Sequence, residues 1–178
     1  MGSVRQEIKQ TRPFASLADE AVVTLLRTTD HARTALSAVV GEVGITLQQY
    51  NVLRILRGAG SSGLPTLEIA SRMIEASPGI TRLVDRLEAK GLVLRERCPA
   101  DHRQVLCRAS ERALQRLSSL ERPMAEASER LMSALDARRR SELVRLLDAV
   151  RTAGTAPGRA ADRRESKPEP RSKKERRR

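Results

Sequence analysis

The sequence predicts a mainly α-helical fold that contains one small β-hairpin. Apolar residues recur at helical spacing through most of residues 14–153, whereas residues 92–97 and 104–108 are expected to form two short strands around a polar loop. The helix before this hairpin has a basic outer face. A basic helix followed at once by a basic hairpin is typical of a winged helix-turn-helix. The expected order of elements is therefore α-α-α-α-β-β-α-α.

The first part of the chain is expected to hold an arm and two helices. Residues 1–13 are polar and are expected to form a flexible arm. Residues 14–45 carry apolar side chains at helical spacing, which predicts one long amphipathic helix. Thr46 and Gln49 then match a capping box, in which each side chain satisfies an orphan backbone N–H at the start of the next helix. Residues 46–109 are expected to form the winged unit.

The helix-turn-helix is expected within residues 66–91. Thr66 can cap a short helix, and Ser77 can cap the outward-facing helix, with Pro78 at its first position. Gly91 suits the C-terminal end of this helix. The apolar stripe of the outward-facing helix consists of Ile80, Leu83, Val84 and Leu87, and the side chains opposite or beside it include Arg82, Asp85 and Arg86.

Two further helices are expected in residues 110–153. Ser110 can cap a long helix with a coiled-coil-like seam. Pro123 lies within this helix and should kink it or remove one of its hydrogen bonds. Asp136 can cap the last helix. The first and last helices would leave long apolar faces exposed in a monomer, so we expect these terminal helices to form a two-fold dimer. Residues 154–178 cannot build a core and are expected to be a disordered basic tail.

Charge and composition limit the classes of molecule that the protein is expected to bind. The formal net charge of +12 favours a polyanionic partner. Half of this charge lies in residues 159–178, which contain ten Lys or Arg residues and four acidic residues. The chain has no Trp and one residue each of Phe and Tyr, whereas proteins that bind single strands stack bases on aromatic side chains. Double-stranded nucleic acid is therefore the favoured partner. The tail could add phosphate contacts or serve only as a solubilising end, and the sequence favours neither.

Catalysis and metal binding find little support in the sequence. Phosphate-binding Gly loops and the HExxH and GxSxG motifs are absent, and His31 and His102 are too isolated to hold a metal ion. We therefore expect no enzyme, no cofactor and no metal site. Cys98 and Cys107 are expected to be single structural cysteines, too far apart to bridge. No signal peptide and no apolar run of about 20 residues is present, which favours the cytoplasm.

Three runs of residues resemble the MarR family of bacterial transcriptional regulators: LQQYNVLRIL, LEIASRM and SPGITRLVDRLEAKGLVLRERCPADHRQVL. The most specific features are the run from Thr81 to Val93 and the pair Asp101 and Arg103 in the wing. The resemblance implies a nucleoid-associated homodimer that represses or activates transcription from palindromic operators in double-stranded DNA. It also implies release of the operator on binding a small, frequently phenolic, effector or on thiol oxidation.

The resemblance also implies roles for individual residues. Arg103 would reach into the minor groove while Asp101 steadies the wing, and five residues would face the major groove or its phosphates: Ser77, Pro78, Thr81, Arg82 and Arg86. The chemistry agrees, because an arginine can fork to guanine or enter a narrow A·T minor groove. The family's usual Asp-Arg-Arg in the wing reads Asp-His-Arg here.

Several alternatives stay open at this level. Arg82 and Arg103 could be solvated charges, Arg86 could pair with nearby acids, and Asp85 could pair with Arg103 or Arg82. His31 could line a ligand cleft between the first helix and the DNA-binding unit, or lie on the helix surface. Tyr50 could line the same cleft or belong to the core. A non-specific architectural or RNA-binding protein is the alternative function.

Overall fold

The computed structural model describes residues 2–75, 79–98 and 104–153. The chain divides into two compact units, residues 1–133 and 134–178, and each is described by itself. The expected tail and the loop of the wing lie outside the described residues.

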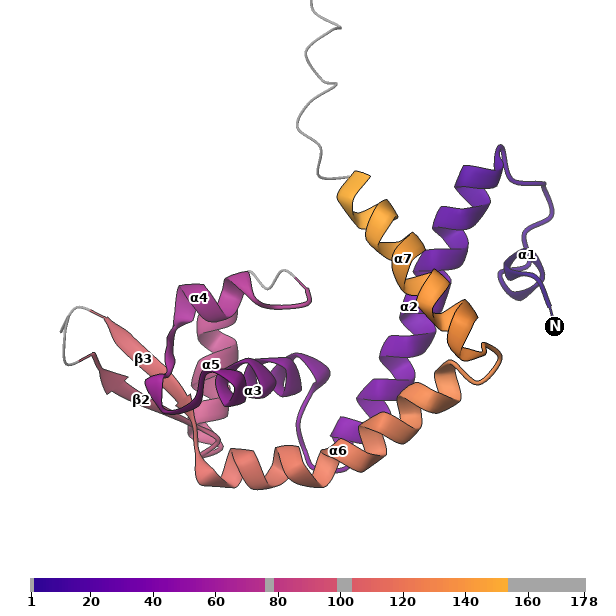
Figure 1. The fold of residues 1–178 in the computed structure, drawn as a ribbon. Coiled ribbons are helices and arrows are strands. Elements are labelled where there is room, and N and C mark those ends of the chain that lie inside the picture. Colours follow the sequence, from indigo (N-terminus) through magenta and orange to yellow (C-terminus); the bar gives the residue numbers. More distant parts are fainter. Residues whose placement is uncertain (1, 76–78, 99–103, 154–178) are drawn as a thin grey trace, which may run out of the picture. The chain divides into compact units, whose positions relative to one another are not determined.

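Helices dominate the first unit, and a small sheet accompanies them (Figure 1). The second unit contains α7 (Ala137–Ala153). In chain order the first unit comprises α1 (Val4–Glu7), α2 (Leu17–Gly41), α3 (Leu47–Ala59), the 3-10 turn η1 (Gly60–Ser62), β1 (Leu64–Pro65), α4 (Thr66–Ser71), α5 (Ile80–Ala89), β2 (Val93–Arg97), β3 (Val105–Ala109) and α6 (Glu111–Leu131). The expected mainly α fold with a β-hairpin is confirmed. Three short elements were not expected: α1 within the N-terminal arm, the turn η1, and β1.

The sheet has three antiparallel strands in the order β1-β3-β2, where the sequence predicted only the hairpin of β2 and β3. Strand β1 pairs Leu64 with Cys107 at the edge of the sheet. Its entry is fixed by Gly63, which has a φ of 66° and lies so close to β3 that an added Cβ would be 2.9 Å from the carbonyl oxygen of Cys107. A glycine is required there because this backbone conformation is costly for other residues.

Three of the expected helix caps are confirmed. The Thr46 hydroxyl accepts from the N–H of Gln49, while the Gln49 side chain accepts from the N–H of Thr46. Ser110 caps α6 in the same manner by accepting from the N–H of Ala113. Asp136 accepts from the N–H of Arg139 at the start of α7. These caps are set by residues three apart in the chain, which is why sequence alone locates them.

Two expected caps are wrong. Pro65, not Thr66, occupies the N-cap of α4, and the Thr66 hydroxyl instead lies 3.8 Å from the Cys107 sulfur. The N-cap of α5 is Gly79, whose carbonyl oxygen accepts the first helical hydrogen bond from the N–H of Leu83, so the helix begins after Ser77. Strand pairing of Pro65 with β3 fixes the start of α4, a tertiary cause that local pattern does not reveal.

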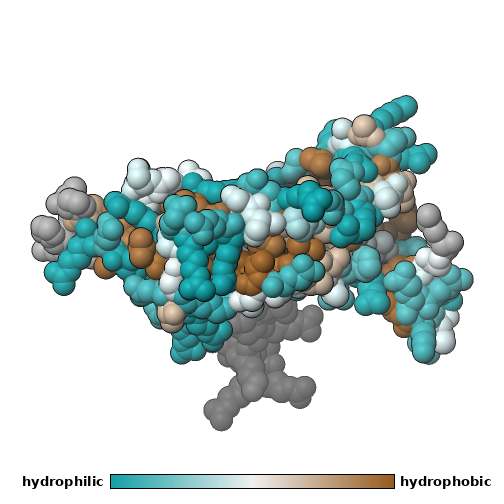
Figure 2. Space-filling view, turned by 90° about the horizontal axis from the view of Figure 1, so that it is seen from below, coloured by the Kyte–Doolittle hydropathy of each residue, from teal (hydrophilic) through white to brown (hydrophobic). Residues whose placement is uncertain are grey.

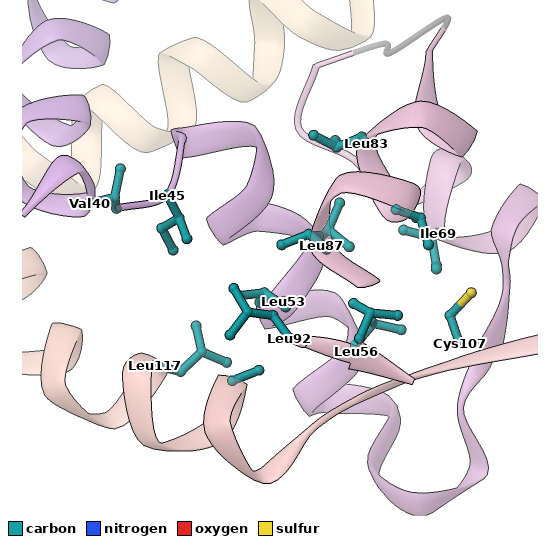
Figure 3. Packing of buried hydrophobic residues seen from close by; sticks show 14 of the residues in the cluster. Val40, Ile45, Leu53, Leu56, Ile69, Leu83, Leu87, Leu92, Cys107 and Leu117 are labelled. Atoms are coloured by element: carbon teal, nitrogen blue, oxygen red, sulfur yellow. The ribbon is translucent and has the colours of Figure 1, made fainter. Parts of the chain in front are cut away.

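The core of the first unit lies between α3, α5, α6 and the sheet. The predicted stripe of α5 is confirmed, because all four of its apolar residues are buried. Figure 3 shows Leu53, Leu87 and Leu92 pointing into one cluster, and each of them is 0% exposed. Burying a leucine side chain contributes about 1.5–3 kcal/mol. The core therefore fixes one face of α5 firmly and leaves the opposite face in solvent.

The terminal helices carry exposed apolar side chains, as the sequence predicted for a single chain. In α2 the largest are Leu17 at 81% and Leu26 at 65% exposed, and in α7 Val144, Leu146 and Val150 are 50–60% exposed. Helix α7 buries no residue within the chain. Figure 2 shows hydrophobic surface among hydrophilic groups on one face of the molecule. Among the helices in the described residues, none is long and apolar enough to cross a membrane.

Candidate nucleic-acid interface

Helix α5 presents a basic face to solvent. Thr81, Arg82 and Arg86 are exposed, on the side of the helix opposite the buried stripe. Gly91, with a φ of 67°, ends the helix, and the N–H of Leu92 returns to the carbonyl oxygen of Leu87 at 2.9 Å. This closure matches the expected glycine stop and satisfies a carbonyl that the helix end would leave unpaired.

The arginines of this face are available for a partner. Between described residues, no ion pair or hydrogen bond engages the guanidinium of Arg82 or Arg86. The alternative that Arg86 pairs with the acids on α5 is therefore not what the structure has. Four of the expected site residues, Ser77, Pro78, Asp101 and Arg103, lie outside the described residues.

The acids on α5 have a partner that the sequence did not predict. Arg95 of β2 places one guanidinium nitrogen 2.6 Å from the Asp85 carboxylate and another 3.1 Å from the Glu88 carboxylate. The alternative that Asp85 pairs with Arg82 is therefore wrong, and the alternative that it pairs with Arg103 lies outside the described residues. The cause is geometric, because Asp85 and Glu88 lie on the flank of α5 that packs along β2. The signal available in the sequence was a pair of acids three residues apart in α5, with the hairpin beginning just after Gly91.

The surroundings of Arg95 favour the charged form of its guanidinium. Partial burial lowers the pKa of its guanidinium, but the hydrogen bonds to Asp85 and Cys107 and the charges of Glu88 and Asp85 outweigh this effect, so the pKa is raised. Hydrogen bonding to the charged form and nearby opposite charge both favour ionisation. Arg95 therefore carries a full positive charge beside two carboxylates.

The two cysteines are separated along the wing. Cys107 is buried and pairs in register with Arg95, one residue beyond the expected partner Leu94. Cys98 donates its backbone N–H to the Gln104 carbonyl at 2.9 Å, nearer the end of the hairpin. Both thiols are free. No cluster of three or more His, Cys, Asp and Glu side chains suited to a metal ion occurs in the described part of the chain.

A cavity of about 530 Å³ lies between α2, α3, α5 and α6. Its lining includes Leu36 and Met73, and also Arg33, Arg54 and Arg86. Tyr50, a predicted candidate, lines it and packs 5.8 Å from the Arg54 guanidinium.

The other predicted candidate, His31, is exposed and is not among the lining residues, in line with the alternative of a helix-surface histidine. Two residues that line the cavity, Arg33 of α2 and Glu75 before α5, form an ion pair of 2.9 Å. The cavity therefore combines apolar walls with cationic groups, and it touches the basic helix through Arg86.

A family model described as the MarR family matches residues 45–105. The solved structure of a MarR transcription factor from Planctomyces limnophilus is 39% identical to the chain and has a TM-score of 0.59. That match covers 77% of this chain and 99% of the other. The chain belongs to the MarR family. It is therefore a MarR family transcriptional regulator, and regulators of this family are transcription factors rather than enzymes.

Two further regulators extend the comparison. The homoprotocatechuate degradative operon repressor of Escherichia coli is 25% identical over 130 residues, which are 73% of this chain and 86% of the relative. The structure of the PcaV transcriptional regulator of Streptomyces coelicolor, in complex with its natural ligand, is 24% identical with a TM-score of 0.69. This match covers 80% of the MarR chain described here and 99% of PcaV, and it supports the winged-helix fold.

Proposed function

We propose that this MarR family regulator binds a near-palindromic operator in double-stranded DNA as a homodimer, and that a small molecule releases it. The observation that carries the proposal is the exposed basic face of α5. Arg82 and Arg86 project from a helix whose opposite face is buried in the core. Neither guanidinium makes an ion pair or hydrogen bond with another described residue. A rigid helix whose arginines make no ion pair with other described residues suits the major groove, where an arginine forks to guanine.

The remaining contacts are proposed from the resemblance. Ser77 and Pro78 would lie near the N-terminal end of α5, Asp101 would steady the wing, and Arg103 would enter the flanking minor groove. A guanidinium suits that groove where A·T pairs narrow it, because the negative potential is strongest there.

The homodimer is supported by the apolar surface of the terminal helices. The exposed side chains of α2 and α7 would cost free energy in water, and extended apolar surfaces of this kind mark interfaces. A two-fold dimer would present two α5 helices to successive major grooves about 34 Å apart. A near-palindromic operator follows from that symmetry.

The effector step is supported by the cavity. Its volume of about 530 Å³ suits a small molecule. Its tyrosine, apolar side chains and arginines suit a phenolic compound with polar groups, and PcaV was crystallised with a ligand. Because Arg86 and Leu83 of α5 line the cavity, a bound ligand would shift the population toward positions of α5 that do not fit DNA.

Competition against excess random duplex tests the proposal. We expect the full chain to retain a palindromic fragment, selected from random DNA, when random duplex is added in excess. Loss of that fragment at the same rate as random DNA would instead favour the alternative, a non-specific architectural or RNA-binding protein.

A further inference from the structure

We infer that Arg95 is a positioning residue for DNA binding, whose main task is to neutralise the two carboxylates that α5 brings to the DNA-facing surface. This inference rests on the proposed function, because it assumes that the exposed side of α5 meets phosphates. It goes beyond that function by assigning a role to a residue of β2 that is not itself expected to contact DNA.

The exposed side of α5 carries charges of both signs. At about 100° per residue, Arg82 and Arg86 occupy one part of the exposed arc, while Asp85 and Glu88 occupy the part next to β2. The side chains of Asp85 and Glu88 are 50% and 43% exposed. Two uncompensated carboxylates at this position would repel the phosphate backbone and offset the attraction of the arginines.

The position of Arg95 suits this task. Its side chain is 24% exposed, less than either acid, and its two terminal nitrogens reach a different carboxylate each, at 2.6 and 3.1 Å. On the neighbouring strand β3, Cys107 lies opposite Arg95 in the strand register. The guanidinium of Arg95 thus extends from β2 to both carboxylates. One fixed cation shared by two carboxylates reduces their combined charge from −2 to −1.

The geometry also joins the wing to the helix. Arg95 lies on β2 and its two acids lie on α5, so the fork fixes the base of the hairpin against the helix. A fork with two partners is more directional than a lysine ammonium, which is a point charge. Neutralising the acids and fixing the hairpin against α5 can be tested separately, because the R95K substitution keeps the positive charge but removes the guanidinium that reaches two partners.

Four variants of the full chain separate these effects. We expect R95Q to weaken binding to the duplex selected by the wild-type protein by about tenfold, comparable to the loss of one charged contact. R95K should stay within about threefold of wild type, because the charge remains. D85N/E88Q should bind at least as tightly as wild type. The triple variant R95Q/D85N/E88Q should stay within about threefold of D85N/E88Q, because no acid is left to neutralise.

Arg57→Gln is the matched control. Arg57 of α3 makes an ion pair of 2.7 Å with Glu121 of α6, and this pair includes no residue of α5 or the wing strands. We expect R57Q to leave DNA affinity unchanged. Circular dichroism melting of every variant separates lost binding from lost folding. Should R95Q unfold, R95K and the triple variant still carry the test.

Three results would overturn the inference: wild-type affinity in R95Q, a triple variant as weak as R95Q, or an R95K variant as weak as R95Q. The first would mean that the acids do not oppose DNA, and the others that Arg95 acts through packing or fork geometry alone. Absence of DNA binding by the wild-type chain itself would overturn the proposed function and this inference together, and it is measured before any variant.

Discussion

The substitution Arg82→Ala is expected to weaken DNA recognition without changing the stability of the fold. The Arg82 side chain is exposed and has no ion pair or hydrogen bond with a described residue, so its removal should change the free energy of unfolding by no more than about 0.5 kcal/mol. An arginine that forks to a base contributes about 1–3 kcal/mol of binding free energy. We therefore expect the affinity for the selected duplex to fall by about five- to 150-fold while the melting curve is unchanged.

Fluorescence anisotropy with the labelled duplex measures this loss, and a random duplex in the same assay reports the non-specific component. Specific affinity should fall more than non-specific affinity, because a base contact discriminates among sequences and a phosphate contact does not. Arg103→Ala is expected to cost a similar amount through the minor groove. Full binding by the double variant Arg82→Ala/Arg103→Ala would refute the assignment of the recognition helix and wing.

Three other perturbations test the fold, the dimer and the tail. Leu87→Ala should lower the free energy of unfolding by about 2–5 kcal/mol in urea titration, because this side chain is fully buried; a loss below about 1 kcal/mol would contradict its place in the core. Leu146→Glu places a charge on the exposed apolar face of α7 and should shift sedimentation from dimer to monomer, and an unchanged dimer would exclude this face from the interface. Truncation after Ala153 should reduce the slope of log affinity against log salt by about 0.9 for each phosphate contact that the tail makes, and an unchanged slope would mean that the tail does not touch DNA.

Local pattern predicted the parts of the fold that residues close in sequence determine. The capping pair Thr46 and Gln49, the glycine stop at Gly91 and the apolar stripe of α5 all depend on spacings of seven residues or fewer, and all are confirmed. Strand β1 escaped prediction because two residues show no alternation, and its pairing with β3 joins segments about 40 residues apart.

The site was predictable only where its residues share one helix. Arg82 and Arg86 follow from the pattern of α5, since the buried stripe determines which side chains face solvent. The partner of Asp85 was not predictable, because it depends on how β2 packs against α5. The cavity beside Tyr50 likewise depends on the packing of four helices, and no sequence motif in the chain predicts it.

Sequencing the DNA fragments that the wild-type chain retains from a random pool tests operator recognition most directly. We expect the retained fragments to share a near-palindrome whose half-sites are centred about 10–10.5 base pairs apart, the spacing at which two α5 helices meet successive major grooves. Retained fragments with no common sequence would contradict sequence-specific recognition by a two-fold dimer.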